Sequence, residues 1–402
     1  MGCTEPIAIA YTTAVARKHL GEEALSGVLY VSPNIVKNVK SVTVPHTDGM
    51  VGLKAAFAAG LAGGNADSGL EVLSDIDEGQ IPRIKELKDS FPLEVEIPED
   101  AHVLDCAVRL KGAHHTSYVR LTDSHTNIVL IERDGETVYL NDNFHEVKKT
   151  DRTLLNVEDI VSFAETVNTD DVKEVLDRQI QYNMAIANEG MKHNYGANIG
   201  KILLRSFAPD IKNTAMAYAA AGSDARMNGC ELPVIINSGS GNQGITASVP
   251  VIIYARDLHT EEDKLYRALC ISNLITIHLK TGIGPLSAYC GAVSAGAGAA
   301  CGIAYLQGCG FTEIAHCLVN ALAVDSGIIC DGAKASCAAK IATAVETGLL
   351  GLQMHYNGSQ FYAGEGIIKS GVEDTIKSVS RLASRGMRET DKEIIRIMLE
   401  EA

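Results

Sequence analysis

The chain has 402 residues, of which 46% are hydrophobic and 21% are charged, and its net charge is −15. An acidic chain of this kind is a poor ligand for nucleic acid, and its apolar content is too high for a disordered protein. The length predicts two or three subdomains. With no Trp, 5% aromatic residues and 37 Gly, the core must be packed mostly from small aliphatic residues.

Residues 1–92 predict a segment that mixes helix and strand. We expect a helix over residues 5–19 with Thr4 as its N-cap, because apolar residues there follow a capping residue. Two short β-like runs and a Gly-rich helical stretch follow, at residues 28–32, 42–45 and 49–64.

Residues 93–150 predict a β-rich subdomain, because apolar and polar residues alternate there with a period of two. Asp134-Gly135 separates two such runs and is typical of a tight hairpin turn. The strand pattern stops before residue 151.

Residues 151–402 predict a mainly helical domain. Four residues are expected as N-caps, and the last of them is part of a capping box with Glu393: Asn156, Thr169, Thr260 and Thr390. The predicted fold class is therefore α+β, with a mainly helical C-terminal domain that contains a Gly/Ala-rich central helix and with a smaller β-rich subdomain in the N-terminal half.

The stretch 281–312 has no acidic or basic residue, but its many Gly, Ala and Ser residues favour a buried, tightly packed helix over a membrane span. The N-terminus lacks the basic start of a signal peptide. We therefore expect a cytoplasmic protein with no membrane partner.

The ten cysteines point to metal binding or catalysis sooner than to disulfides. Cys330 and Cys337 flank a short loop, and Ser336 is a natural N-cap that places Cys337 in the first turn of a helix, where the thiolate is favoured. Cys290 lies among small residues that leave room beside its sulfur. Three thiolates suit a [4Fe-4S] cluster with one open iron, but the spacing alone is weak evidence for a metal and favours inert buried cysteines. We expect the following six cysteines to be buried and inert: Cys106, Cys230, Cys270, Cys301, Cys309 and Cys317.

Other polar residues are candidates for substrate binding or proton transfer. A Gly/Ser/Asn loop follows an apolar run and can cradle a carboxylate or a phosphate through Asn237, Ser238, Gly239, Ser240, Asn242 and Gln243. Arg226 can pair with a carboxylate, although a structural role beside Asp224 fits equally well. His125 is the best candidate for a general base, with a surface histidine at a strand edge as the alternative. Cys3 is the rival base, unless it is an N-terminal residue with no role.

Several motifs together resemble the L-cysteine desulfidase family, which is itself similar to the iron–sulfur L-serine dehydratases. They are Gly2-Cys3-Thr4-Glu5-Pro6, Val31-Ser32-Pro33-Asn34, Gly49-Met50-Val51-Gly52, Gly63-Gly64-Asn65, His125-Thr126-Asn127, Ser223-Asp224-Ala225-Arg226-Met227, Asn237 to Gly244 and the loop from Cys330 to Cys337. The resemblance implies that Cys290, Cys330 and Cys337 hold a [4Fe-4S] cluster with one open iron. It also makes Cys3 a candidate active-site thiol and places Asn127 in a substrate-binding motif.

The activity that this resemblance implies is β-elimination from L-cysteine to sulfide, ammonia and pyruvate. The open iron would bind the substrate sulfur, and His125 or Cys3 would take the Cα proton. The expected partner is a small amino acid, and a homo-oligomer is expected.

Three alternatives remain open on the sequence. The same centre would serve an L-serine dehydratase, in which the open iron binds a hydroxyl. A pyridoxal-phosphate lyase would use the 237–244 loop for phosphate and Lys334 or Lys340 for the Schiff base. A non-catalytic sensor would bind an amino acid at residues 93–145.

Overall fold

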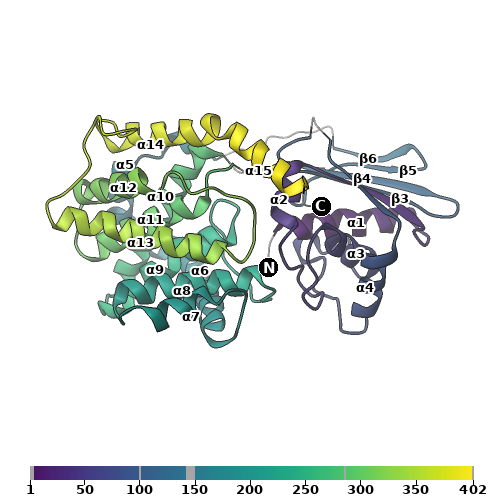
Figure 1. The fold of residues 1–402 in the computed structure, drawn as a ribbon, viewed down its shortest axis with the longest axis horizontal. Coiled ribbons are helices and arrows are strands. Elements are labelled where there is room, and N and C mark those ends of the chain that lie inside the picture. Colours follow the sequence, from purple (N-terminus) through teal and green to yellow (C-terminus); the bar gives the residue numbers. More distant parts are fainter. Residues whose placement is uncertain (1–3, 99–100, 142–149, 285–286, 401–402) are drawn as a thin grey trace. The chain divides into compact units, whose positions relative to one another are not determined.

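The computed structural model describes residues 4–98, 101–141, 150–284 and 287–400, and the chain divides into two compact units. The first unit contains Met1–Lys149, Asp331–Lys334 and Ile395–Ala402. The second contains Thr150–Cys330 and Ala335–Ile394. Figure 1 shows the elements of both units, and each unit is described by itself.

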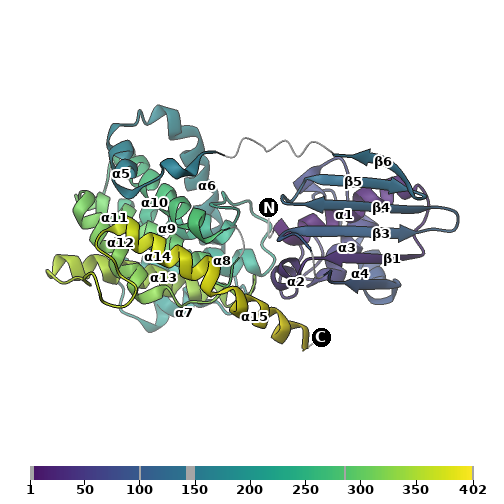
Figure 2. The same cartoon turned by 90° about the horizontal axis from the view of Figure 1, so that it is seen from above.

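The first unit is built on one six-stranded sheet with the order β2-β1-β3-β4-β5-β6. Strands β1 and β2 are parallel and every other neighbouring pair is antiparallel. Figure 2 shows β1, β3, β4, β5 and β6 side by side in this order. The strands are β1 (Ser26–Val31), β2 (Leu93–Glu96), β3 (Asp105–Lys111), β4 (Thr116–Thr122), β5 (Ile128–Arg133) and β6 (Glu136–Leu140). The sheet therefore joins a strand from residues 1–92 with strands from residues 93–150.

Helices cover one face of this sheet (Figure 1). Helix α1 packs on β3 and β4, and α3 packs in turn on α1. Alternate residues of β4, such as Val119 and Leu121, are buried under these helices. The helices of the unit are α1 (Thr4–Leu20), α2 (Pro33–Val39), α3 (Leu53–Ala62), the short 3₁₀ turn η1 (Gly69–Glu71) and α4 (Ile81–Ser90).

The hairpin predicted at Asp134-Gly135 is confirmed: both residues have positive φ, 54° and 84°, and they connect β5 to β6. The strand expected at residues 42–45 is wrong. Only Thr43 pairs there, in an isolated bridge with Val51, because the chain turns back at once through His46 and Asp48 in left-handed conformations.

The second unit is a helical bundle. Its elements are η2 (Arg152–Leu154), α5 (Val157–Thr166), α6 (Asp170–Lys192), α7 (Ile199–Ser206), α8 (Ile211–Met227), α9 (Gly241–Asp257), α10 (Glu262–Ile283), α11 (Gly291–Leu306), α12 (Phe311–Asp325), α13 (Cys337–Tyr356), α14 (Val372–Arg381) and the π-helical turn η3 (Leu382–Gly386). Helix α15 (Arg388–Glu400) follows, and its residues from Ile395 onward group with the first unit.

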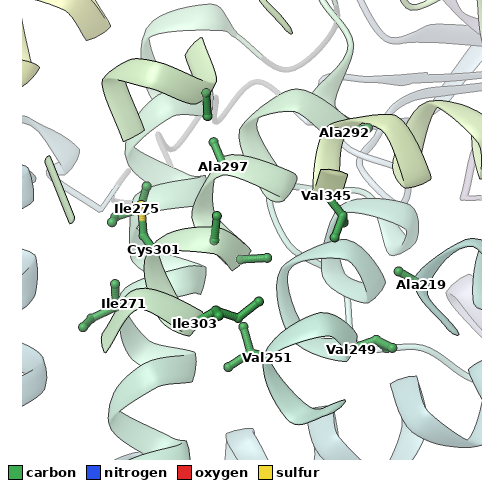
Figure 3. Close-up of a cluster of buried hydrophobic side chains, with 14 of the residues drawn as sticks. Ala219, Val249, Val251, Ile271, Ile275, Ala292, Ala297, Cys301, Ile303 and Val345 are labelled. Carbon is green, nitrogen blue, oxygen red and sulfur yellow. The ribbon is translucent and has the colours of Figure 1, made fainter. Parts of the chain in front are cut away.

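Helix α11 is the Gly/Ala-rich centre of this bundle and contacts α9, α10, α12 and α13. A Cβ on Gly298 would lie 2.4 Å from Oγ1 of Thr276, and one on Gly296 would lie 2.6 Å from the carbonyl oxygen of Ala344. Glycine thus lets the neighbouring backbones approach closely. Figure 3 shows side chains of this core, Val251, Ile275, Cys301 and Val345 among them.

The uncharged stretch 281–312 therefore contributes the buried helix α11, as predicted. Among the described residues, no helix combines the length and the hydropathy needed to cross a lipid bilayer.

The predicted α+β class is confirmed, whereas the predicted helix starts are only partly right. Asn156 caps α5 by accepting a hydrogen bond from the Asp159 N–H (2.8 Å), and Ser336 directly precedes α13. Thr260 is not an N-cap, because its N–H closes the end of α9 by donating to the Ala255 carbonyl (2.9 Å). Thr390 is also not an N-cap, because α15 has already begun at Arg388.

Candidate active site

The second unit brings the three predicted ligand cysteines together. Tyr289 and Ile329 form an isolated antiparallel bridge. The Cys290 N–H donates to the Ile328 carbonyl (3.0 Å), and the Cys330 N–H donates to the Ala288 carbonyl (2.6 Å). Two segments 40 residues apart in sequence are thereby held side by side, with one cysteine on each.

Two of the three thiols lie at helix N-termini. Cys290 is the N-cap residue of α11, and Cys337 is the first residue of α13. The unpaired N–H groups of a first helical turn favour negative charge, so both positions favour a thiolate.

The thiols also interact with one another. A hydrogen bond with the Cys330 thiol raises the pKa of Cys290 well above its ordinary value, burial raises it further, and the nearby Cys337 thiol adds to the effect. The two neighbouring thiols thus oppose the ionisation of Cys290, and a positive centre beside them would stabilise its thiolate.

This donor set fits an iron–sulfur cluster, because soft thiolates are the ligands that such clusters use. In the described part of the chain, no set of three or more His, Cys, Asp or Glu side chains is arranged as a ready-made metal site. The residues that would hold a cluster are therefore inferred from the proximity of three thiols, and their assignment as ligands remains a prediction.

The predicted Gly/Ser/Asn loop lies next to this group as a tight turn that leads into α9. Asn237 and Ser240 exchange two backbone hydrogen bonds (3.1 and 3.0 Å) around Ser238 and Gly239, which have φ values of 48° and 81°. Ser240 is the N-cap of α9 and accepts from the Gln243 N–H (3.4 Å). The turn thus presents the N-terminus of a helix.

Asn237 has a structural role in this turn. Its amide nitrogen donates to both the backbone and the side-chain oxygens of Asn273 (3.2 and 2.9 Å), and its side-chain oxygen accepts from the Ser238 hydroxyl (2.9 Å). These bonds fix the position of the turn, and they leave the Asn237 side chain little capacity for a substrate.

Arg226 and Gln243 link the turn to the thiols. Arg226 is buried and donates to the side-chain oxygen of Asn242 (3.2 Å). A Cβ on Gly291 would lie 2.6 Å from the Gln243 amide, so Gln243 packs against the residue that follows Cys290. Among the described residues, the buried Oε1 atom of Gln243 has no hydrogen-bond partner.

Three further buried polar residues were not predicted as site residues. The hydroxyls of Ser223 and Ser294 have no hydrogen-bond partner in the described part of the chain, and Ser294 lies one helical turn after Cys290. Asp224 is also buried, so it does not form the surface pair with Arg226 that the sequence left open. The sequence offered little to identify these residues, because a single serine in an Ala/Gly-rich helix, such as Ser294, belongs to no recognisable motif.

Asp224 holds the start of α7. One of its carboxylate oxygens accepts from the Gly200 N–H (3.1 Å), and the other has no partner among the described residues. Burial raises the pKa of Asp224 to about 6. Asp325, another buried carboxyl group with a pKa raised by burial to about 6, accepts from the Thr347 hydroxyl (3.0 Å).

The candidate base His125 belongs to the first unit, in the turn between β4 and β5. Its Nε2 atom is buried without a partner among the described residues, and burial lowers the pKa of the ring while the Glu5 carboxylate opposes that effect. A neutral imidazole of this kind can accept a proton.

The two remaining predicted site residues are Asn127 and Cys3. The side chain of Asn127 donates to the Thr122 carbonyl (3.0 Å) and accepts from Asn141 (3.4 Å), so it stabilises the turn that carries His125. Cys3 lies outside the described residues.

The lysines considered for a Schiff base make polar contacts of their own. Lys334 forms an ion pair with Asp331, and Lys340 donates to the Ile329 carbonyl (2.8 Å). A Schiff-base lysine must be neutral and free to attack a carbonyl. These contacts do not favour that role for either residue.

Comparison with known families shows which class of protein this fold belongs to, a lyase-type enzyme of the serine dehydratase kind. The model of the serine dehydratase alpha chain family matches residues 67–396. The chain belongs to this family, whose members are typically associated with iron–sulfur clusters.

Curated relatives cover the chain almost completely. The UPF0597 protein of Desulfitobacterium hafniense is 54% identical over 403 residues, which is 99% of this chain and 93% of that protein. The UPF0597 protein of Lachnoclostridium phytofermentans is 47% identical over 400 residues (99% and 96%), and that of Treponema denticola is 44% identical over 409 residues (100% and 95%). These names state no activity.

Proposed function

We propose that this protein is an L-cysteine desulfidase. It would convert L-cysteine and one water into pyruvate, ammonia and hydrogen sulfide by β-elimination, with a [4Fe-4S] cluster held by Cys290, Cys330 and Cys337. The observation that carries the proposal is the meeting of these three thiols in the second unit.

When bound, such a cluster has one iron without a protein ligand, which acts as a Lewis acid toward the β-substituent of the substrate. Three thiols gather in this group among the residues that the structure describes, and this number supports an under-ligated centre. Cys301 and Cys317, which lie against each other in the core, are both fully buried and have no route to a substrate.

The polar residues beside the thiols would bind and orient the amino acid. The guanidinium group of Arg226 and the N-terminus of α9 are suited to a carboxylate, and the unpartnered Oε1 of Gln243 is suited to the substrate ammonium group. Fixing both ends of the substrate aligns its Cα–H and Cβ–S bonds for elimination.

The Cα proton needs an acceptor that is neutral at pH 7 or ionised as a thiolate. His125 is supported by its lowered pKa and its unpartnered Nε2 atom, and Cys3 remains the second candidate. The eneamine left after loss of sulfide would tautomerise and take up water to release ammonia.

The ligand assignment is tested by replacing Cys290, Cys330 and Cys337 singly with Ala. After anaerobic reconstitution, each variant should lose most of its iron and acid-labile sulfide and should release no sulfide from L-cysteine. C309A is the matched control, because Cys309 lies in the same unit beside Tyr356 and away from the three thiols. A full cluster and full activity in any of the three variants would remove that residue from the ligand set.

L-serine dehydration is the second candidate, and the family match favours it. The substrate would then carry a hydroxyl in place of the thiol, and water would leave in place of sulfide. Rates with both amino acids decide between the two: we expect kcat/KM to be higher for L-cysteine, because a thiolate is the softer ligand. A higher value for L-serine would replace the desulfidase proposal.

A further inference from the structure

The second unit contains a cavity of about 680 Å³ that is separate from the residues proposed for catalysis. Its wall is formed by the segment before α5, the C-terminal part of α10, α14 and the π-helical turn η3. Arginines from three of these segments line it, together with hydroxyl groups from α10, α14 and η3.

The cavity is cationic in a strongly acidic protein. Lys377 is paired with Asp374 (2.9 Å), but the guanidinium groups of Arg152, Arg381 and Arg385 have no ion pair or hydrogen bond within the described parts of the chain. The chain as a whole has a net charge of −15. Three unpaired arginines around one hollow create a positive potential that favours an anion between them.

Glu373, the one carboxylate in the wall, can offset only one of the three arginine charges, and both of its oxygens already have hydrogen-bond partners. One oxygen is 2.8 Å from Nε2 of His278, and the other accepts from the Val157 N–H at 2.8 Å. Glu373 thereby ties α14 to α10 and α5, which makes the cavity a fixed feature of the bundle.

The shape of the wall also depends on close packing. Ser380 approaches α10 so closely that a Cβ on Gly282 would lie 2.2 Å from its Oγ atom. The π-helical turn then places Arg385 after Arg381 on the same wall. Turns of this kind occur often at functional sites.

From this geometry we infer that the cavity binds a small metabolite with two or more negative charges, carried on phosphate or carboxylate groups. Arginine forks bind both groups in bidentate fashion, and the hydroxyls of Thr281, Ser380 and Ser384 add further polar contacts. The volume lies in the range of ordinary small-molecule sites.

The same wall is bonded to the chain that leads to the thiols. The Ser287 hydroxyl donates to the carbonyl of Ala383 in η3 (3.0 Å) and accepts from the Tyr289 N–H (3.1 Å). Tyr289 precedes Cys290 directly. An anion that fixes the position of η3 would therefore also fix the position of the segment that carries Cys290.

The inference is tested by calorimetric titration of the full chain, without cluster, with inorganic pyrophosphate and with citrate in low-salt buffer. We expect saturable binding of one or both probes, and the tighter probe identifies phosphate or carboxylate as the preferred group. R381Q/R385Q should weaken the affinity by at least about tenfold.

The matched control is R205Q/R256Q, which removes the same charge from two exposed arginines of α7 and α9 outside this cavity. Its affinity should stay within about twofold of the wild-type value. Absence of saturable binding of both probes, or equal weakening in the control, would overturn the inference. Because the chain is tested without a cluster, failure here leaves the proposed lyase activity unaffected.

Discussion

At the scale of single residues, the second unit contains two kinds of buried amide. Asn183 is fully bonded: its oxygen accepts from the Ile235 N–H (2.9 Å) and its nitrogen donates to the Ile235 carbonyl (3.2 Å) and to Ser248 (3.0 Å). The Oε1 atom of Gln243 has no partner among the described residues. A buried acceptor without a partner lowers stability, and the proposed contact with the substrate would satisfy this one.

Substitution separates these two roles. Q243L removes an unsatisfied acceptor, so the free energy of unfolding should change by less than about 1 kcal/mol, while kcat/KM for L-cysteine should fall at least about tenfold. N183L leaves bonded partners unsatisfied and should cost about 1–3 kcal/mol. Denaturant unfolding and steady-state kinetics measure both effects. A Q243L variant as destabilised as N183L would assign Gln243 a structural role.

Asp224 should affect the pH dependence of stability. Its pKa is raised by burial from 3.8 to about 6, so the folded state holds a proton that the unfolded state releases between these values. This contribution to stability is present below pH 4 and is lost as the pH rises through 6. D224N should therefore match the wild type near pH 4 and exceed it by roughly 1–3 kcal/mol at pH 7. A stability difference that does not change with pH would contradict this account.

His125 should set the acid limb of the activity profile. Burial lowers its pKa below the ordinary value of 6.5, so the ring accepts a proton until the pH falls below that value. We expect kcat/KM to decline only below about pH 6.5, and H125N to lose at least about a hundredfold in kcat/KM and to abolish this limb. Persistence of the same limb in H125N would transfer the role to another group such as Cys3.

At the scale of elements, the bundle depends on how closely α11 approaches its neighbours. A methyl group at Gly298 would meet the Thr276 hydroxyl at 2.4 Å and the Ser272 carbonyl at 2.6 Å. G298A should therefore lower the free energy of unfolding by about 1–3 kcal/mol. G327A is the control, because no atom lies within 4 Å of the added methyl group, and its effect should stay within about 1 kcal/mol. Similar stabilities of the two variants would show that α11 is not tightly packed.

Local sequence patterns predicted the elements well where a single short-range interaction decides the structure. The Asp134-Gly135 hairpin needs two left-handed residues in succession, and the Asn156 cap needs only its own helix. Thr260 and Thr390 were misassigned because the preceding segments, the end of α9 and the turn η3, determine where the next helices begin. That information is not contained in the capping residue itself.

At the scale of the whole molecule, sequence analysis identified the three thiols but not the interaction that brings them together. The bridge between Tyr289 and Ile329 pairs segments that carry no strand pattern. The structural role of Asn237 likewise depends on Asn273, which lies on another helix. Asp331–Lys334 and Ile395–Ala402 group with the first unit although they are distant from it in sequence, an arrangement that chain order does not indicate.

The most direct test of the proposed under-ligated centre is Mössbauer spectroscopy of the anaerobically reconstituted protein with ⁵⁷Fe, before and after addition of L-cysteine. If Cys290, Cys330 and Cys337 are the only protein ligands, one iron of the four should change its isomer shift and quadrupole splitting when substrate binds, while the other three stay unchanged. Four irons that all keep their parameters in the presence of L-cysteine would contradict the account.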